Sequence, residues 1–168
     1  MPTKFRGSGE AIRALNAYIN LTRATDSLLA SASAQIEAQG LTLGQFGVLE
    51  SLFHLGPMCQ KALAEKMLRS PGNVTLIVDN LERQGFVRRE RQKNDRRMVT
   101  IHLTPRGRTL IARIFPPHAK VIVSLMSSLD GREQETLRRL CRKLGRGVSG
   151  SSIETESKEK KHGASSAK

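Results

Sequence analysis

The chain has 168 residues, of which 28 are Lys or Arg and 15 are Asp or Glu, giving a formal net charge of +13. This length suits one domain, and the excess of positive charge indicates an acidic partner, most commonly nucleic acid. No apolar run approaches the roughly 20 residues that cross a bilayer, and residues 1–9 lack the apolar stretch of a signal peptide, so we expect a cytoplasmic protein with no membrane segment.

Most of the positive charge lies outside the C-terminal tail. Residues 145–168 carry five basic and three acidic residues, so residues 1–144 keep +11 of the +13. The tail is dominated by Gly, Ser, Lys and Glu, and we expect it to be disordered. Charge alone leaves an acidic membrane surface or a merely solvated basic surface open, so the position of the basic residues has to decide.

Metal and catalytic motifs are missing from the sequence. Two cysteines and four histidines are scattered without the spacing of metal ligands, and we expect no metal and no cofactor. The chain also lacks a phosphate-binding glycine loop, a nucleophile elbow and an isolated carboxylate pair. We therefore expect a protein that is not an enzyme.

The first predicted element is a long helix over about 10–39. Apolar residues recur there at spacings of three and four, including Ile12, Leu15, Ile19 and Ile36, and a second row widens the apolar face. Such a helix can pack within its own chain. Its length, and the polar residues that break the stripe, favour partial burial against a second subunit.

Three short helices are expected next. Thr42 and Gln45 form a capping-box pattern that opens a helix, which Gly56 and Pro57 close. Residues 58–59 are expected to be a link, and residues 60–68 a brief helix. Ser70 and Pro71 then begin a helix that ends at Gly85.

This last helix has a buried face and a free face. Val74, Ile77, Val78 and Leu81 share the spacing of one buried stripe. Two short helices joined by a tight turn make a helix-turn-helix, and the second enters the DNA major groove. The candidate DNA-binding residues on it are Ser70, Pro71, Gly72, Asn73, Thr75, Leu76 and Asp79.

A basic hairpin is expected directly after this helix. Residues 86–91 and 98–103 have the pattern of two strands, and seven basic residues face two acidic ones between positions 83 and 97. A solvated hairpin would explain the charge but not its position, which is that of a wing reaching phosphates or the minor groove. The candidate DNA-binding residues of this wing are Arg89, Arg91, Lys93, Asp95, Arg96 and Arg97.

Two further helices complete the predicted elements. Thr104 and Pro105 open a helix that Pro116-Pro117 should kink or interrupt. Asp130 with Glu133 opens the last one, whose apolar stripe we expect at a dimer interface, with Cys141 buried in it. The stripe consists of Leu137, Leu140, Cys141 and Leu144.

Over about residues 15–144 the sequence resembles the multiple-antibiotic-resistance regulators called MarR. The marks that carry the resemblance are the runs VDNLERQGFV (78–87), NDRR (94–97) and IHLTPRG (101–107). The resemblance implies a mainly α fold with a small β-wing: a winged helix-turn-helix with N- and C-terminal dimerisation helices. In these terms residues 1–9 are a flexible N-terminus, 10–144 the domain and 145–168 the disordered tail. Within the domain, about 10–39 and 104–144 are the dimerisation helices and about 42–103 the DNA-binding lobe.

The resemblance also implies roles for individual residues. Asp95 matches the carboxylate that orients basic side chains of the wing, and Arg97 matches an Arg that enters the minor groove. Leu76 stands where many members have Arg, so the guanine contact that Arg could make is unavailable, and apolar contact with a thymine methyl is an alternative. The ligand cavity of the family lies between the dimer helices and the lobe, which makes Tyr18, Phe53, His54 and His118 candidate effector residues, each of which ordinary packing would also explain.

Cys59 is a candidate redox residue. It occupies the capping position of a helix, beside helical amides and near Lys61, a setting that favours the thiolate. A small packing residue at a turn is the alternative.

We therefore expect a homodimer that binds a palindromic operator in double-stranded DNA. We expect repression that a small phenolic or aromatic effector, or an oxidant or electrophile, releases. The alternatives are a winged helix that binds nucleic acid without sequence preference or one that serves as a protein-interaction module.

Overall fold

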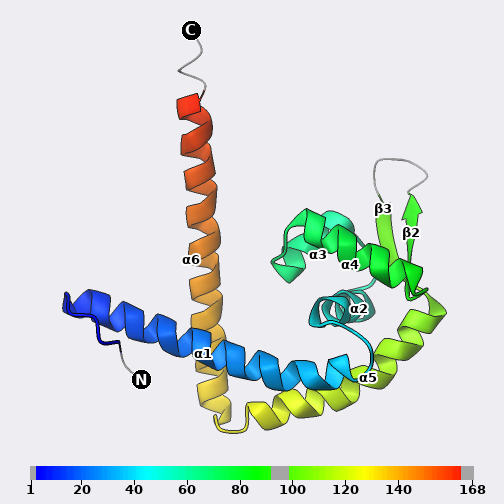
Figure 1. Cartoon of the computed structure of the whole chain (residues 1–168), viewed down its shortest axis with the longest axis horizontal. Coiled ribbons are helices and arrows are strands. Elements are labelled where there is room, and N and C mark those ends of the chain that lie inside the picture. Colours follow the sequence, from blue (N-terminus) through cyan, green and yellow to red (C-terminus); the bar gives the residue numbers. More distant parts are fainter. Residues whose placement is uncertain (1–2, 92–98, 164–168) are drawn as a thin grey trace. The chain divides into compact units, whose positions relative to one another are not determined.

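The computed structural model describes residues 3–91 and 99–163, with side chains up to residue 147 in the last helix. The chain divides into two compact units, Met1–Val123 and Ser124–Lys168. In chain order the elements of the first unit are α1 (Gly9–Glu37), α2 (Leu43–Leu55), β1 (Met58–Cys59), α3 (Gln60–Met67), α4 (Pro71–Arg83), β2 (Val87–Arg91), β3 (Val99–Leu103) and α5 (Pro105–Leu125), whose end reaches into the second unit (Figure 1). The second unit contains α6 (Gly131–Gly163).

Helix α1 confirms the long first helix of the sequence analysis. Ser8 caps it by accepting a hydrogen bond from the Ala11 amide. Only Ala32 and Ile36 near its C-terminal end are buried, whereas Tyr18 is 67% exposed. The apolar stripe that includes Ile12, Leu15 and Ile19 is only partly buried in the single chain.

The helix-turn-helix forms around one apolar core. Helices α2, α3 and α4 contact one another and the sheet, and fully buried side chains such as Leu49, Leu63 and Val78 fill the space between them. Burying one such side chain contributes roughly 1.5–3 kcal/mol. These contacts fix the orientation of α4, whose opposite face stays accessible.

The expected caps are present. Thr42 and Gln45 make both hydrogen bonds of the capping box at the start of α2. The Ser70 hydroxyl accepts from the Asn73 amide with Pro71 at the first position of α4. Because local side chains satisfy these free amides, the sequence alone located both helix starts.

The segment 58–59 is a strand and not the expected link. Met58 pairs with Ile101 and Cys59 with Thr100, which gives an antiparallel sheet in the order β1-β3-β2. Two residues are too few to show a period of two, and the pairing partner lies about 40 residues away, so local pattern could not reveal this strand.

The hairpin strands agree with the prediction. Strand β2 pairs with β3 in register from Val87 opposite Leu103 to Arg91 opposite Val99. Val87 and Ile101 are buried against the helices. Residues 92–98, between the strands, lie outside the described residues.

The junction between the hairpin and α5 is tightly packed. The Thr104 hydroxyl donates to the Gly85 carbonyl at 2.7 Å and accepts from the Gly107 amide at 3.0 Å. A Cβ added at Gly107 would lie 1.9 Å from the Phe86 carbonyl oxygen. Only glycine allows this approach of α5 to the strand.

Helix α5 passes through Pro116 and Pro117 without interruption. Figure 1 shows it curving along its length, as expected where two successive prolines remove backbone donors and crowd the preceding turn. The predicted interruption is therefore wrong, whereas a local kink at the two prolines stays a prediction.

Two expectations for the C-terminal region differ from the structure. Asp130 and Glu133 do form the predicted capping box, but α6 continues to Gly163, into the segment expected to be disordered. Glu and Lys, common there, have good helix propensity even without an apolar stripe. Cys141, expected to be buried, is exposed, because no described residue of the single chain covers this face of α6.

Among the described residues, no helix combines the length and the apolar character needed to cross a membrane.

Candidate nucleic-acid interface

The N-terminal half of α4 presents an accessible face. Ser70, Pro71, Gly72 and Asn73 are exposed, and Leu76 is 66% exposed. Val74, Val78 and Leu81 hold the opposite face in the core. The first turn carries amides without a helical partner and no acidic residue, which is a setting suited to anionic groups such as phosphates.

Thr75 is less available than the sequence suggested. It is half-buried, and its hydroxyl donates to the Pro71 carbonyl at 2.9 Å while accepting from the Gln60 side-chain amide. The one donor of the hydroxyl is therefore used within the chain. What remains for a base is one lone pair and the methyl group.

Gln60 was not singled out from the sequence. It reaches Thr75 from the first position of α3, fifteen residues away, and so connects the two helices of the motif. No local pattern marks a glutamine for such a role, because its partner is set by the crossing of α3 and α4.

Leu68 was also missed. It lies in the turn between α3 and α4 in the left-handed conformation, with φ 51° and ψ 44°, and its side chain is 87% exposed. Among the described non-glycine residues it alone has positive φ. A leucine in this conformation is strained by about 1–2 kcal/mol.

Asp79 and Arg89 are paired with each other. An Arg89 Nη2 to Asp79 Oδ1 distance of 2.6 Å links β2 to α4, and Glu82 is bound to the same guanidinium. Partial burial lowers the pKa of Arg89, but hydrogen bonds to Asp79 and Glu82 and the charges of both carboxylates outweigh this and raise the pKa above its ordinary value. Both residues were expected to face DNA; the structure directs them toward each other.

The remaining cations of β2 differ in their partners. Arg88 Nη1 lies 2.5 Å from Glu90 Oε2, and both side chains are exposed. The same Glu90 oxygen lies 3.5 Å from His102 Nε2. Arg91 is exposed, and no described residue forms an ion pair with it. Lys93, Asp95, Arg96 and Arg97 lie outside the described residues, so their assignment to DNA stays a prediction.

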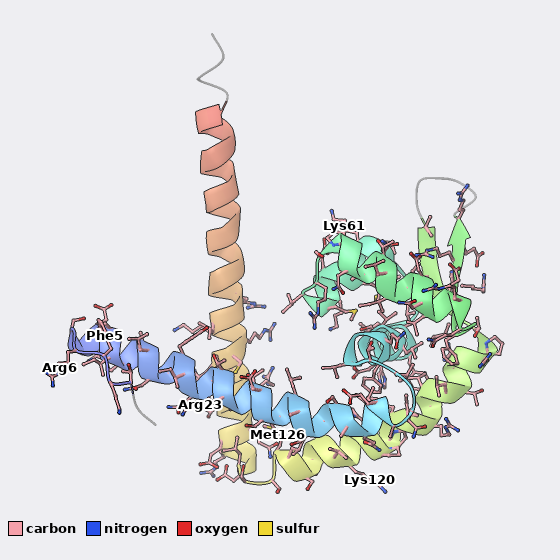
Figure 2. The ribbon with its side chains drawn as sticks, in the orientation of Figure 1. Phe5, Arg6, Arg23, Lys61, Lys120 and Met126 are labelled. Carbon is pink, nitrogen blue, oxygen red and sulfur yellow. The ribbon has the colours of Figure 1, made fainter. Side chains whose placement is uncertain are left out.

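Helix α3 adds a cation to this lobe. Lys61 is 84% exposed and only loosely paired with Glu65 at 4.0 Å. Figure 2 shows it on the side of α3 that is turned away from α2.

A cavity of about 460 Å³ lies beside α2, between it and the end of α3. His54 and His118 line it together with Phe46, Met67 and the charged residues Glu50, Lys66 and Arg69. The Phe53 ring packs against the His54 ring at a centroid distance of 5.1 Å, but Phe53 does not line this cavity. Tyr18 lines neither this cavity nor the smaller one described next.

The second cavity, about 250 Å³, lies among α1, α2 and α5 and shares His118 with the first. Gln35 Oε1 and His118 Nδ1 are buried without hydrogen-bond partners among the described residues. The His118 ring packs on Phe46 at a centroid distance of 4.6 Å. Two polar atoms without partners at one cavity are suited to a polar ligand.

Cys59 lies at the start of α3, as predicted. It is half-buried, its side chain caps no amide, and its backbone belongs to β1. Among the described residues, no group of three or more His, Cys, Asp or Glu is placed to hold a metal ion.

Comparison with known proteins agrees with this geometry. Residues 41–99 match the model of the MarR family. The HTH-type transcriptional regulator YkoM of Bacillus subtilis is 36% identical over 136 residues, which are 81% of this chain and 88% of the relative.

Solved structures show the same fold. AbsC, a MarR family transcriptional regulator from Streptomyces coelicolor, superposes with a TM-score of 0.78 at 19% identity over 87% of this chain and 99% of AbsC. BpsR of Bordetella bronchiseptica superposes with a TM-score of 0.70 at 25% identity, over 77% of this chain and 98% of its own. The BpsR structure concerns regulation of DNA binding by 6-hydroxynicotinic acid. With the fold, the helix-turn-helix and these relatives in agreement, the chain belongs to the MarR family of DNA-binding transcriptional regulators.

Proposed function

We propose that the chain is a homodimeric repressor that reads a palindromic operator with α4 in the major groove and the hairpin beside it. The observation that carries this proposal is the free N-terminal face of α4, held by a buried opposite face and followed by a basic hairpin. A helix placed in this way supplies base contacts, and the hairpin cations supply attraction to phosphates.

The dimer is supported by the uncovered leucines of α6. Leu137, Leu140 and Leu144 are 36%, 51% and 54% exposed in the single chain. A two-fold symmetric dimer would bury this stripe and would require a two-fold symmetric operator.

The test of this function is selection of bound duplexes from genomic DNA, followed by titration of the selected and a random duplex at one salt concentration. We expect selected duplexes to share an inverted repeat and to bind at least about 1,000-fold more tightly than random DNA. Equal affinity for both duplexes would favour a winged helix without sequence preference. Absence of binding to either would favour a protein-interaction module. Transcription from a promoter with the selected repeat, assayed with and without the protein, distinguishes repression from activation.

We also propose that a small aromatic effector binds the cavity lined by His54 and His118. Aromatic rings and both signs of charge surround a volume suited to a one-ring molecule. BpsR, whose DNA binding is regulated by 6-hydroxynicotinic acid, supports this chemistry. A panel of hydroxylated aromatic acids should release the operator from the wild type, and His118→Ala should weaken the response without changing operator affinity.

Oxidant or electrophile sensing by Cys59 is the second candidate for release. Its half-buried thiol without a capping hydrogen bond supports it. Mild peroxide or quinone should then weaken operator binding, and Cys59→Ser should remove that response while keeping binding. An equal response in the mutant would leave Cys59 a packing residue.

A further inference from the structure

An ion-pair cluster joins the recognition helix to the hairpin. Arg89 on β2 places Nη2 2.6 Å from Asp79 Oδ1 and Nη1 2.6 Å from Glu82 Oε2. The Arg89 backbone amide donates to the other oxygen of Glu82 at 2.9 Å. Asp79 and Glu82 are one helical turn apart on α4, so three contacts fix one strand position against one helix face.

The cluster is sheltered enough to be rigid. The Arg89 side chain is 26% exposed, against 45% for Asp79 and 38% for Glu82. Charge-assisted hydrogen bonds from a planar guanidinium to two carboxylates hold both distance and orientation. Two negative charges also face one positive charge, so within this cluster the positive charge of Arg89 is fully compensated.

Arg91 offers an internal comparison. It lies two positions further along β2, on the same face of the strand as Arg89, because successive side chains alternate. Yet Arg91 is exposed and has no ion-pair partner among the described residues. The two arginines therefore share a strand, a face and a charge, and differ in their partners.

We propose that Arg89 is a positioning residue and not a phosphate contact: with Asp79 and Glu82 it sets the angle between α4 and the hairpin, and the two carboxylates keep its charge from attracting DNA without regard to sequence. This proposal rests on the proposed use of α4 and the hairpin. It assigns different roles to Arg89 and Arg91, which the sequence alone groups together as basic residues of the wing. It also gives Asp79 a role other than contact with a base.

The first test compares Arg89→Lys with Arg91→Lys. Lysine keeps the charge but cannot bridge two carboxylates with fixed geometry, so Arg89→Lys should lower operator affinity on the order of tenfold. Random-duplex affinity and its salt dependence should stay unchanged in that variant. Arg91→Lys also keeps its charge but has no ion pair with a described residue to lose, so it should leave the ratio of operator to random-duplex affinity unchanged. Retained operator affinity in Arg89→Lys would overturn the positioning role. Partial unfolding would lower both affinities together, so the ratio distinguishes misfolding from misplacement.

The second test removes the carboxylates with Asp79→Asn and Glu82→Gln together. Arg89 is then released toward DNA. Random-duplex affinity should rise, and the salt dependence should steepen by about 0.9 for each additional phosphate that Arg89 neutralises. Glu65→Gln is the matched control for loss of a negative charge on the same lobe, since Glu65 does not contact Arg89. A rise no greater than that of the control would overturn the role of the carboxylates.

A third variant, Arg91→Gln, reports on the interface itself. It should flatten the salt dependence, because it removes a cation that has no ion-pair partner in the described part of the chain and that the proposed interface places beside DNA. An unchanged slope would mean that β2 does not approach DNA, and the proposed interface would fail whatever Arg89 does. Failure of the interface and failure of the positioning role therefore give different results.

Discussion

One residue in the turn between α3 and α4 has two features that lower the stability of the folded chain. Leu68 has a left-handed backbone and an almost fully exposed apolar side chain. Neither property stabilises the chain, and strain of this kind is common where a partner is contacted. The residue can therefore be changed with little effect on the core.

Leu68→Gly should raise the free energy of unfolding by about 1 kcal/mol, because glycine adopts this conformation without strain. Urea denaturation measures the change. Leu68→Ala is the control: it shortens the same side chain but keeps a Cβ in the left-handed region, and it should give no increase in stability. Equal stabilisation by both variants would place the effect in the exposed side chain and not in the backbone.

Thr75 gives a second prediction at this scale. Because its hydroxyl donates to Pro71 and accepts from Gln60, the parts left for a base are one lone pair and the methyl group, and we expect the methyl group to make the contact. Thr75→Val should therefore keep the preference for the operator over a duplex altered under α4 better than Thr75→Ser does. A base edge read by a side chain contributes about 1–3 kcal/mol of discrimination, which competition binding resolves. Better retention by the serine variant would show that the hydroxyl reads the base.

At the scale of elements, the close approach of α5 to the hairpin is the most constrained junction. Gly107 faces the Phe86 carbonyl, and Thr104 bonds both the hairpin and the first turn of α5. The run Thr104-Pro105-Arg106-Gly107 is thus a packing motif that sets the course of α5 from the end of β3.

Gly107→Ala should destabilise the chain by about 1–3 kcal/mol, the usual cost of overpacking, since the new Cβ would meet a backbone oxygen. Gly131→Ala at the start of α6 meets nothing within 4 Å and serves as control. It should be neutral or slightly stabilising, since alanine favours helices. Thermal and urea unfolding report both. A neutral Gly107→Ala would mean that α5 can move away from the hairpin without cost.

At the scale of the whole molecule, the exposed stripe of α6 bears on the proposed dimer. Leu140→Asp would bury an unpaired carboxylate in that interface and should yield monomers in light scattering at micromolar concentration. Arg142→Asp introduces the same side chain off the stripe and should stay dimeric. In Leu140→Asp, operator affinity should fall together with the molecular mass, because a monomer contacts only one half-site and binds it weakly. A wild-type monomer would remove the basis for a palindromic operator.

The sequence determined those elements of this protein whose signals are local, and the strand β1 and the continuation of α6 to Gly163 were not among them. Capping pairs such as Thr42 with Gln45, the stripe of α4 and the turn at Gly85 lie within a few residues of one another, and each was found where predicted. The motif runs likewise sufficed for the family. Only the tertiary structure decided which side chains meet: β1 pairs with a strand about 40 residues away, Gln60 with Thr75, and Arg89 with Asp79 and Glu82. A basic residue in a sequence carries the same charge whether it is paired or free. Its availability to DNA depends on carboxylates brought to it by the packing of α4 on β2, and no local pattern contains that information.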